Sequence, residues 1–274
     1  MDWSASDVIT SDKYLAAFPE HYYKMDAITY GRPVHFRERI CSPPSVRETL
    51  LITGHSDYPI TDALTHRYPN ALWFGVNNQS RLAIGLPLGI TNNTTETNVH
   101  PIYGNVDVMV EVASMQRDIQ NLVYMNFSVD TYPVERRLVQ DMFRGKDWVT
   151  VGTAVPTLEG RKAFLTDMRN HSYVLCPRGN GVDTHRLWET LYMGSIPIVL
   201  WDIAHAGWAD LPILFVESWN DVTEERLRAE LPRFQTTQWN RKKLRIGYWI
   251  NHIRTLYNES RNYPRGHRYK PAVL

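Results

Sequence analysis

The sequence holds only two cysteines, Cys41 and Cys176, among 274 residues. A disulfide framework needs several cysteines, so we expect the core alone to stabilise this chain, in a reducing compartment. No apolar run approaches the roughly 18 residues of a membrane-spanning helix. The opening residues MDWSASDVIT also lack the layout of a signal peptide. We therefore expect a cytoplasmic protein without stable membrane insertion.

The sequence also lacks an excess of charge of either sign. Its 30 Lys and Arg against 29 Asp and Glu leave a net charge of +1. No strong global field draws such a chain to nucleic acid or to an anionic membrane, so any anion must be bound locally. The pattern Gly-x-x-x-x-Gly-Lys-Ser/Thr is absent, which argues against a P-loop ATPase.

What the first half does contain is a series of apolar, β-branched runs separated by turn residues. These runs, which predict buried strands, cover residues 49–53, 71–76 and 82–88. Between the first two lies a polar stretch with helical spacing, residues 55–70. Alternating strands and helices predict a parallel sheet with the α/β architecture.

The pattern restarts after residue 118. Strands are predicted at residues 122–128, 148–153, 172–176, 196–200 and 213–216, with a helix at 131–143. An amphipathic helix with a basic start is predicted over 238–257. We therefore expect two α/β domains, residues 1–118 and 119–274.

The most informative segment is residues 172–200, SYVLCPRGNGVDTHRLWETLYMGSIPIVL. An apolar strand leads into a glycine-rich loop, Asp183 or Thr184 opens a helix, and the helix ends at Gly194 before a second strand. Free N–H groups at the start of the helix are suited to a diphosphate. The predicted donor-binding residues here are Arg178, Gly179, Asn180, Gly181, Asp183, Thr184 and Arg186.

Glu189 lies about a turn and a half into the same helix, where a carboxylate can accept both hydroxyl groups of a ribose. Each feature taken singly has another explanation. A glycine pair is often only a turn, and Arg186 with Glu189 fits a surface ion pair at i,i+3. Taken together, they predict one site for an anion and a ribose beyond the end of a strand.

The segment CPRGNGVDTHRLWETLYMGSIPIV resembles the donor-binding signature of exostosin-like glycosyltransferases. The matching positions are Cys176, Pro177, Gly179, Thr184, Arg186, Glu189, Gly194, Ile196 and Pro197. The stretch DLPILFVESWNDVTEERL, from Asp210, resembles the strand and helix that follow, so the resemblance covers roughly the second half of the chain. Ser195 stands where many relatives have Cys.

This resemblance implies a GT-B fold, with two facing Rossmann-like domains and a C-terminal helix crossing back. It also implies a sugar nucleotide in the C-terminal domain and inversion at the anomeric carbon without an obligatory metal or cofactor. The sequence contains no Asp-x-Asp pair, which agrees with transfer that does not require a metal. The chain is similar to the small soluble glycosyltransferases of chloroviruses, which implies a viral enzyme in the host cytoplasm and a xylosyltransferase using UDP-xylose on a glycan hydroxyl.

An inverting transfer requires a general base beside the acceptor hydroxyl. Asp57 is the predicted base and His55 the reserve, because ITGHSDYPI places both after the first predicted strand. Capping of a turn or helix by Asp57 is an equally open interpretation.

Further contacts are predicted at the ends of two other strands. Ser128 and Arg137, in NFSVDTYPVERR, are expected to reach the diphosphate, and a capped helix with an exposed arginine is the alternative. Trp73, Asn77 and Asn78 are expected to contact the acceptor sugar, with core packing as the alternative for Trp73. Two other function classes stay open: a non-catalytic nucleotide-sugar or glycan-binding module, and a glycoside phosphorylase.

Overall fold

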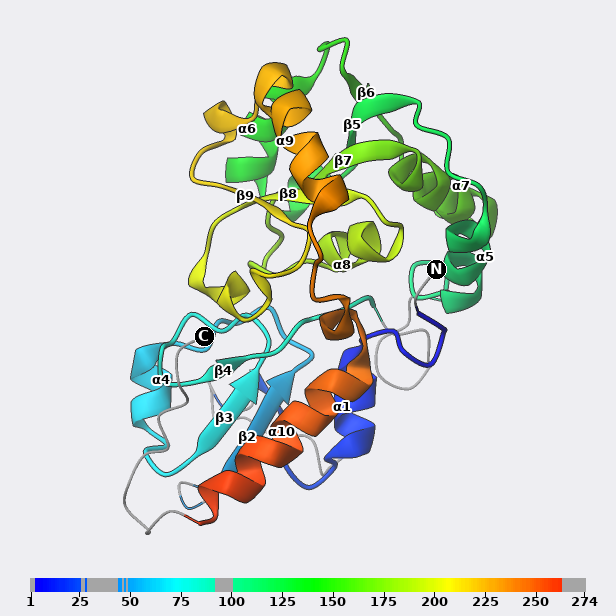
Figure 1. Ribbon diagram of the computed structural model, residues 1–274. Helices are drawn as coiled ribbons and strands as arrows, with labels where there is room; N and C mark the ends of the chain where they lie inside the picture. The colour runs from blue at the N-terminus through cyan, green and yellow to red at the C-terminus, as the bar shows by residue number, and fades with distance from the viewer. Residues whose placement is uncertain are drawn as a thin grey trace.

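The computed structural model describes residues 3–25, 28, 44–45, 47, 49–91 and 101–262. Within these ranges the chain is a mixed α/β protein with two parallel sheets, one in each lobe (Figure 1). The first lobe contains a four-stranded sheet in the order β1-β2-β3-β4. Its elements are α1 (Ser11–Ala17), β1 (Tyr22–Lys24), β2 (Leu50–Gly54), α4 (Asp62–His66), β3 (Leu72–Gly75) and β4 (Ile84–Gly85).

The second lobe contains a five-stranded sheet in the order β6-β5-β7-β8-β9. Its strands are β5 (Asn121–Met125), β6 (Val149–Val151), β7 (His171–Leu175), β8 (Ile196–Leu200) and β9 (Leu214–Val216). Its longer helices are α5 (Val106–Ser114), α6 (Pro133–Phe143), α7 (Leu158–Arg169), α8 (His185–Tyr192) and α9 (Glu224–Thr236). Short 3₁₀ turns are η1 (Val129–Thr131), η2 (Ile203–Trp208) and η3 (Trp219–Asp221).

Most predicted strands are present, and the differences lie mainly in the helices. The predicted helix over 55–70 is reduced to the five residues of α4, because Pro59 and Pro69 flank a short segment. The predicted strand at 82–88 is only the two-residue β4. Sequence patterns also missed α5 and α7, which pack against each other.

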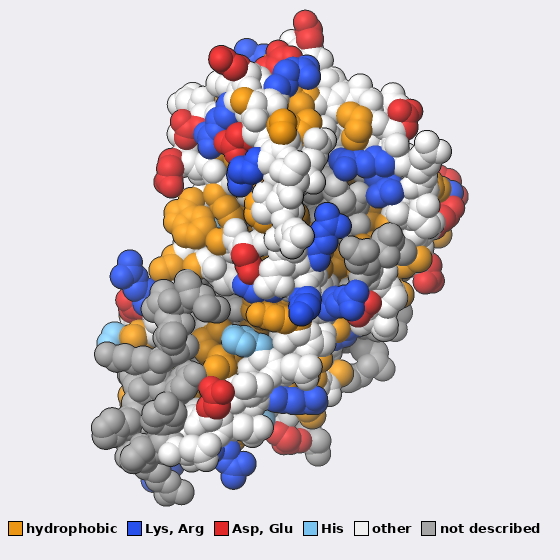
Figure 2. All heavy atoms as spheres, in the orientation of Figure 1, with side chains coloured by type: hydrophobic (Ala, Val, Ile, Leu, Met, Phe, Trp, Pro, Cys, Tyr) orange, Lys and Arg blue, Asp and Glu red, His pale blue; other side chains and the backbone are white. Residues whose placement is uncertain are grey.

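The last helix returns from the second lobe to the first. After α9 the chain passes through η4 (Arg241–Leu244) and forms α10 (Ile246–Ser260), which lies against β3 and α1 (Figure 1). Basic side chains gather near this crossing between the lobes, on the face shown in Figure 2. One basic residue of the crossing, Lys243, is buried and donates to Asp210 Oδ1 and to the carbonyl of Gly207. The two sheets lie on either side of residue 118. Helix α5, which precedes that residue, packs against α7 of the second lobe, and α10, which follows it, packs against the first sheet.

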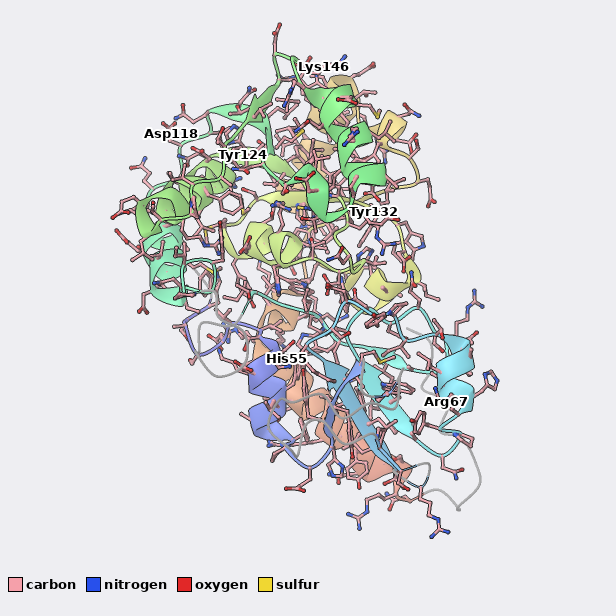
Figure 3. The ribbon with its side chains drawn as sticks, turned by 180° about the vertical axis from the view of Figure 1, so that it is seen from behind. His55, Arg67, Asp118, Tyr124, Tyr132 and Lys146 are labelled. Carbon is pink, nitrogen blue, oxygen red and sulfur yellow. The ribbon has the colours of Figure 1, made fainter. Side chains whose placement is uncertain are left out.

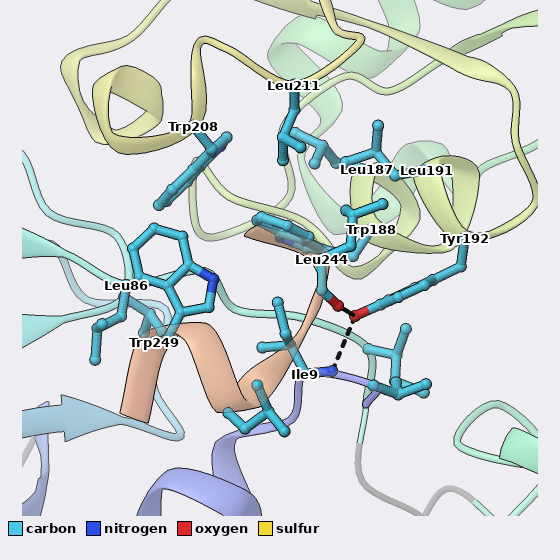
Figure 4. Close-up of a cluster of buried hydrophobic side chains, with 14 of the residues drawn as sticks. Ile9, Leu86, Leu187, Trp188, Leu191, Tyr192, Trp208, Leu211, Leu244 and Trp249 are labelled. Carbon is cyan, nitrogen blue, oxygen red and sulfur yellow. Dashed lines mark hydrogen bonds between the residues drawn. The ribbon is translucent and has the colours of Figure 1, made fainter. Parts of the chain in front are cut away.

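One hydrophobic cluster runs through both lobes (Figure 4). Trp208 lies between Trp188 of α8 and Trp249 of α10, with ring centroids 5.4 and 6.2 Å away. The Tyr192 hydroxyl accepts from the Ile9 N–H at 2.9 Å and donates to the Leu244 carbonyl at 2.8 Å. The lobes therefore share buried apolar surface and are not joined by a linker alone.

None of the helices in the part of the chain that the structure describes is long and apolar enough to cross a membrane.

Candidate active site between the two sheets

A cavity of about 550 Å³ lies between the lobes. The first lobe contributes residues that follow β2 and β4, including His55, Asp57 and Leu88. The second lobe contributes residues that follow β5, β6 and β7. In parallel sheets, ligands bind at the carboxyl ends of strands, and both sheets present those ends here.

The second sheet places this cavity at a topological switch point. Strand β5 pairs with β6 on one side and with β7 on the other, so the connections leaving β5 and β7 diverge. The loop after β5 supplies Asn126, Phe127 and Ser128, and the loop after β7 supplies Gly179 and Gly181. Open α/β sheets typically bind their ligands in the crevice that such a divergence leaves.

The predicted strand, glycine loop and helix of residues 172–200 are present as β7 and α8. Thr184 is the N-cap of α8, and its hydroxyl accepts from the Leu187 N–H. Gly194 has φ +79° and ends the helix. Gly179, Asn180, Gly181 and Thr184 all line the cavity. Arg178 does not, because its guanidinium folds back onto its own loop and donates to the carbonyls of Gly179 and Asn180.

Two arginines face the same aromatic ring in this cavity. The guanidinium carbons of Arg136 and Arg186 lie 5.7 and 5.9 Å from the centre of the Phe127 ring. Burial and the charge of Arg186 lower the pKa of Arg136 to about 10. The Arg186 Nε is buried and has no hydrogen-bond partner among the described residues. Neighbouring cations with spare donors form a site suited to an anion.

Arg136 is fixed by two backbone carbonyls. Its Nε donates to Arg178 and its Nη1 donates to Ser128, both at 2.8 Å. The cation therefore connects the loop after β5 with the loop after β7. Ser128 lines the cavity, as the predicted contact requires. Arg137, the other predicted contact, is exposed and lies outside the lining, so the structure does not place it at the site.

Glu189 lines the cavity as a buried residue, but its partner is not Arg186. Arg161 of α7 donates from Nη2 to Glu189 Oε1 at 2.7 Å, and both side chains are nearly inaccessible. The alternative interpretation, in which Arg186 and Glu189 form a surface ion pair, is therefore wrong. The buried pair holds the Glu189 carboxylate at the wall of the cavity.

Asp183 lines the cavity but is engaged in holding the lobes together. Its carboxylate accepts from the Leu88 N–H of the first lobe and from Trp188 Nε1 of α8, both at 2.8 Å. Burial raises its pKa to about 7. Both carboxylate oxygens are engaged by protein N–H groups. These bonds indicate that Asp183 anchors the loop, and they do not indicate the predicted contact with the donor.

On the first-lobe side, His55 and Asp57 follow β2 and line the cavity. Figure 3 shows His55 on the side of the first lobe that meets the second. Its Nε2 lies 3.0 Å from Asp12 Oδ1 and its Nδ1 lies 2.7 Å from the Tyr22 hydroxyl. Both ring nitrogens are thus occupied. Asp57 is exposed, and the cap of α4 is Thr61, so the helix-capping interpretation of Asp57 is wrong.

The three residues predicted for the acceptor lie outside the cavity lining. Trp73 is core, where Nε1 donates to Thr53 Oγ1, so core packing was the correct alternative. Asn78 bonds within its own lobe, donating to the Ala83 carbonyl and accepting from the Ser80 N–H. Asn77 instead accepts from the Asp183 N–H at 2.9 Å. The carboxamides of both residues are occupied by protein partners.

Arg136 and Arg161 are the two lining cations that the sequence patterns missed. Each lies on the buried stripe of its helix: Arg136 three residues before Val139, and Arg161 four before Leu165. An arginine on an apolar stripe at helical spacing was the available signal. No group of three or more His, Cys, Asp or Glu among the described residues is placed to hold a metal ion.

No protein-family model matches this chain, and no curated protein matches it. Evidence for its function therefore comes from its own residues.

Proposed function

We propose that the chain is an inverting glycosyltransferase of GT-B type that moves a sugar from a nucleotide donor onto a glycan hydroxyl. The proposal is supported chiefly by the Arg136 and Arg186 pair, two adjacent cations in a cavity at the switch point of a parallel sheet. Such a pair favours a ligand that carries more than one negative charge, as a diphosphate does.

In this proposal the donor lies along the second lobe. The diphosphate contacts Arg186 in the first turn of α8, where the helix dipole favours an anion. Glu189, fixed by Arg161, accepts the ribose hydroxyls with its remaining lone pairs. The expectation of UDP-xylose as donor and of a viral enzyme rests on the sequence resemblance.

The transfer breaks one bond and forms one bond. The acceptor oxygen attacks the anomeric carbon, the bond from that carbon to the diphosphate oxygen breaks, and the nucleoside diphosphate leaves with the electron pair. Asp57, on the opposite wall, takes the acceptor proton. Arg136 and Arg186 stabilise the charge that develops on the leaving group, so the proposal requires no metal. His55 remains the reserve base.

The donor site is tested by calorimetric titration of nucleotide sugars in EDTA. We expect one UDP-sugar to bind, and Arg186→Ala to weaken that binding by about 10- to 100-fold, since a hydrogen bond to a charged group contributes about 1.5–3 kcal/mol. Glu189→Gln should weaken it too. Arg144→Ala, an exposed arginine after α6, is the matched control and should bind as the wild type does.

Absence of binding across the panel, or full binding by Arg186→Ala, would contradict the proposed site. Transfer is then followed by release of the nucleoside diphosphate, with Asp57→Asn as the variant. Donor binding with no transfer to any acceptor would favour the nucleotide-sugar-binding module.

A further inference from the structure

Asn77 adopts a backbone conformation that side chains rarely take. It follows β3, has φ +52° and is only 1% exposed. Asparagine tolerates this left-handed region better than most residues, but the region still costs free energy that other contacts must offset. Its surroundings show what those contacts are.

The Asn77 carboxamide bonds to loops of both lobes. Its Oδ1 accepts from the Asp183 N–H at 2.9 Å, which joins it to the glycine loop of the second lobe. Its Nδ2 donates to the Ser56 carbonyl at 3.3 Å, which joins it to the loop that carries Asp57. One buried side chain therefore spans the loop beside the proposed base and the loop beside the proposed diphosphate site.

The glycine loop is shaped around this side chain. A Cβ added to Gly181 would lie 2.6 Å from Asn77 Nδ2, so only glycine leaves room for the carboxamide. The first lobe holds the same segment at two further points, through the Leu88 N–H to Asp183 and through His185 Nδ1 donating to the Gly89 carbonyl. Of these three contacts from the first lobe, the one made by Asn77 also connects to the loop that carries Asp57.

We propose that Asn77 is a positioning residue that fixes the distance between Asp57 and the donor loop. This inference rests on the proposed function. The consequence is kinetic, because a displacement of about 1 Å between reacting groups can lower a rate by about 100-fold. Asn77 touches no substrate in this role and acts through Ser56 and Asp183.

The contact is tested directly by amide hydrogen exchange of residues 179–185. Asn77→Gly removes the carboxamide without straining the left-handed backbone, so the protein should still fold. We expect the Asp183 amide to exchange at least about tenfold faster in this variant. Asn78→Ala is the matched control, because Asn78 is also buried but bonds only within its own lobe. Unchanged exchange in Asn77→Gly, or an equal rise in Asn78→Ala, would overturn the proposal.

The catalytic consequence is read from kcat and KM. Asn77→Gly should lower kcat for transfer about tenfold or more, and much more than Asn78→Ala does, with a smaller change in donor KM. Gly181→Ala should also lower kcat, because its methyl group meets Asn77. In the Asn77→Gly background that penalty should disappear. An undiminished penalty in the double variant would overturn the positioning role.

The two proposals fail in different ways. A wild-type protein that binds no nucleotide sugar overturns the proposed function, whatever Asn77 does. A wild-type protein that transfers sugar while Asn77→Gly matches Asn78→Ala in kcat overturns only the role of Asn77.

Discussion

At the scale of single residues, the cavity is built from charges that are almost withdrawn from water. Arg161 and Glu189 form an ion pair at 2.7 Å, and the Asp183 carboxylate accepts N–H groups from both lobes. A buried charge without a partner is costly, so each of these groups affects folding as well as binding.

The Arg161 and Glu189 pair leads to a stability prediction. Glu189→Ala leaves the Arg161 charge buried and unpaired, and should lower the free energy of unfolding by about 3–5 kcal/mol. The double variant Arg161→Met with Glu189→Leu removes both charges and should lie closer to the wild type. Urea unfolding of the three proteins measures this. A double variant less stable than Glu189→Ala would contradict it.

Asp183 leads to a prediction on pH. Burial raises its pKa from 3.8 in the unfolded chain to about 7 when folded, so the folded state holds the proton more tightly. Its contribution to stability is therefore complete below about pH 4 and is lost as pH rises to about 7. The loss is at most about 4 kcal/mol at 1.4 kcal/mol per pKa unit.

Asp183→Asn cannot ionise at this position. The unfolding free energy of the wild type should therefore fall relative to that of the variant as pH rises from 4.5 to 8. Urea unfolding at several pH values measures it. Asp147→Asn, an exposed aspartate, is the control and should show little change. A difference that is flat with pH for Asp183→Asn would show that this carboxylate is already ionised at low pH.

At the scale of elements, sequence patterns predicted most strands, because each of those is a short apolar run, but they missed β1 and made β4 too long. They failed for α7, whose inward face carries Arg161 beside Leu165 and Met168, so the apolar stripe is interrupted by a charge. They also failed at Asn77, where nothing local indicates that the side chain crosses to the other lobe. The glycine loop and α8 were predictable, because the turn residues, the cap and the final glycine are all local signals.

Two glycines test the backbone reasoning at this scale. Gly194 ends α8 at φ +79°, so Gly194→Ala should destabilise the protein by about 1 kcal/mol although no atom lies close enough to clash. Gly247 lies inside α10, outside the left-handed region and in open space, so Gly247→Ala should stabilise by about 0.5 kcal/mol. Thermal unfolding of the two variants should therefore shift in opposite directions. A shift in the same direction for both would contradict this account.

At the scale of the whole molecule, the two sheets share one core. Trp249 of α10 lies against Trp208, and Ile246 donates its N–H to the Asp7 carbonyl at 2.8 Å beside this contact. The first sheet is covered by a helix that the chain supplies only after the second sheet is complete. Neither lobe has its full core without the other, so we expect a single cooperative unfolding transition.

Hydrogen exchange at increasing urea measures this for each sheet separately, using peptides that cover β2 and β7. The two midpoints should coincide in the wild type. Trp249→Ala should lower both together, because deletion of a buried tryptophan costs about 3–5 kcal/mol and the shared core transmits the loss. Phe143→Ala, in the separate cluster beneath α6, should also lower both. If Trp249→Ala lowers the β2 midpoint and leaves the β7 midpoint unchanged, the lobes unfold independently. Asn77 would then connect two lobes that can separate.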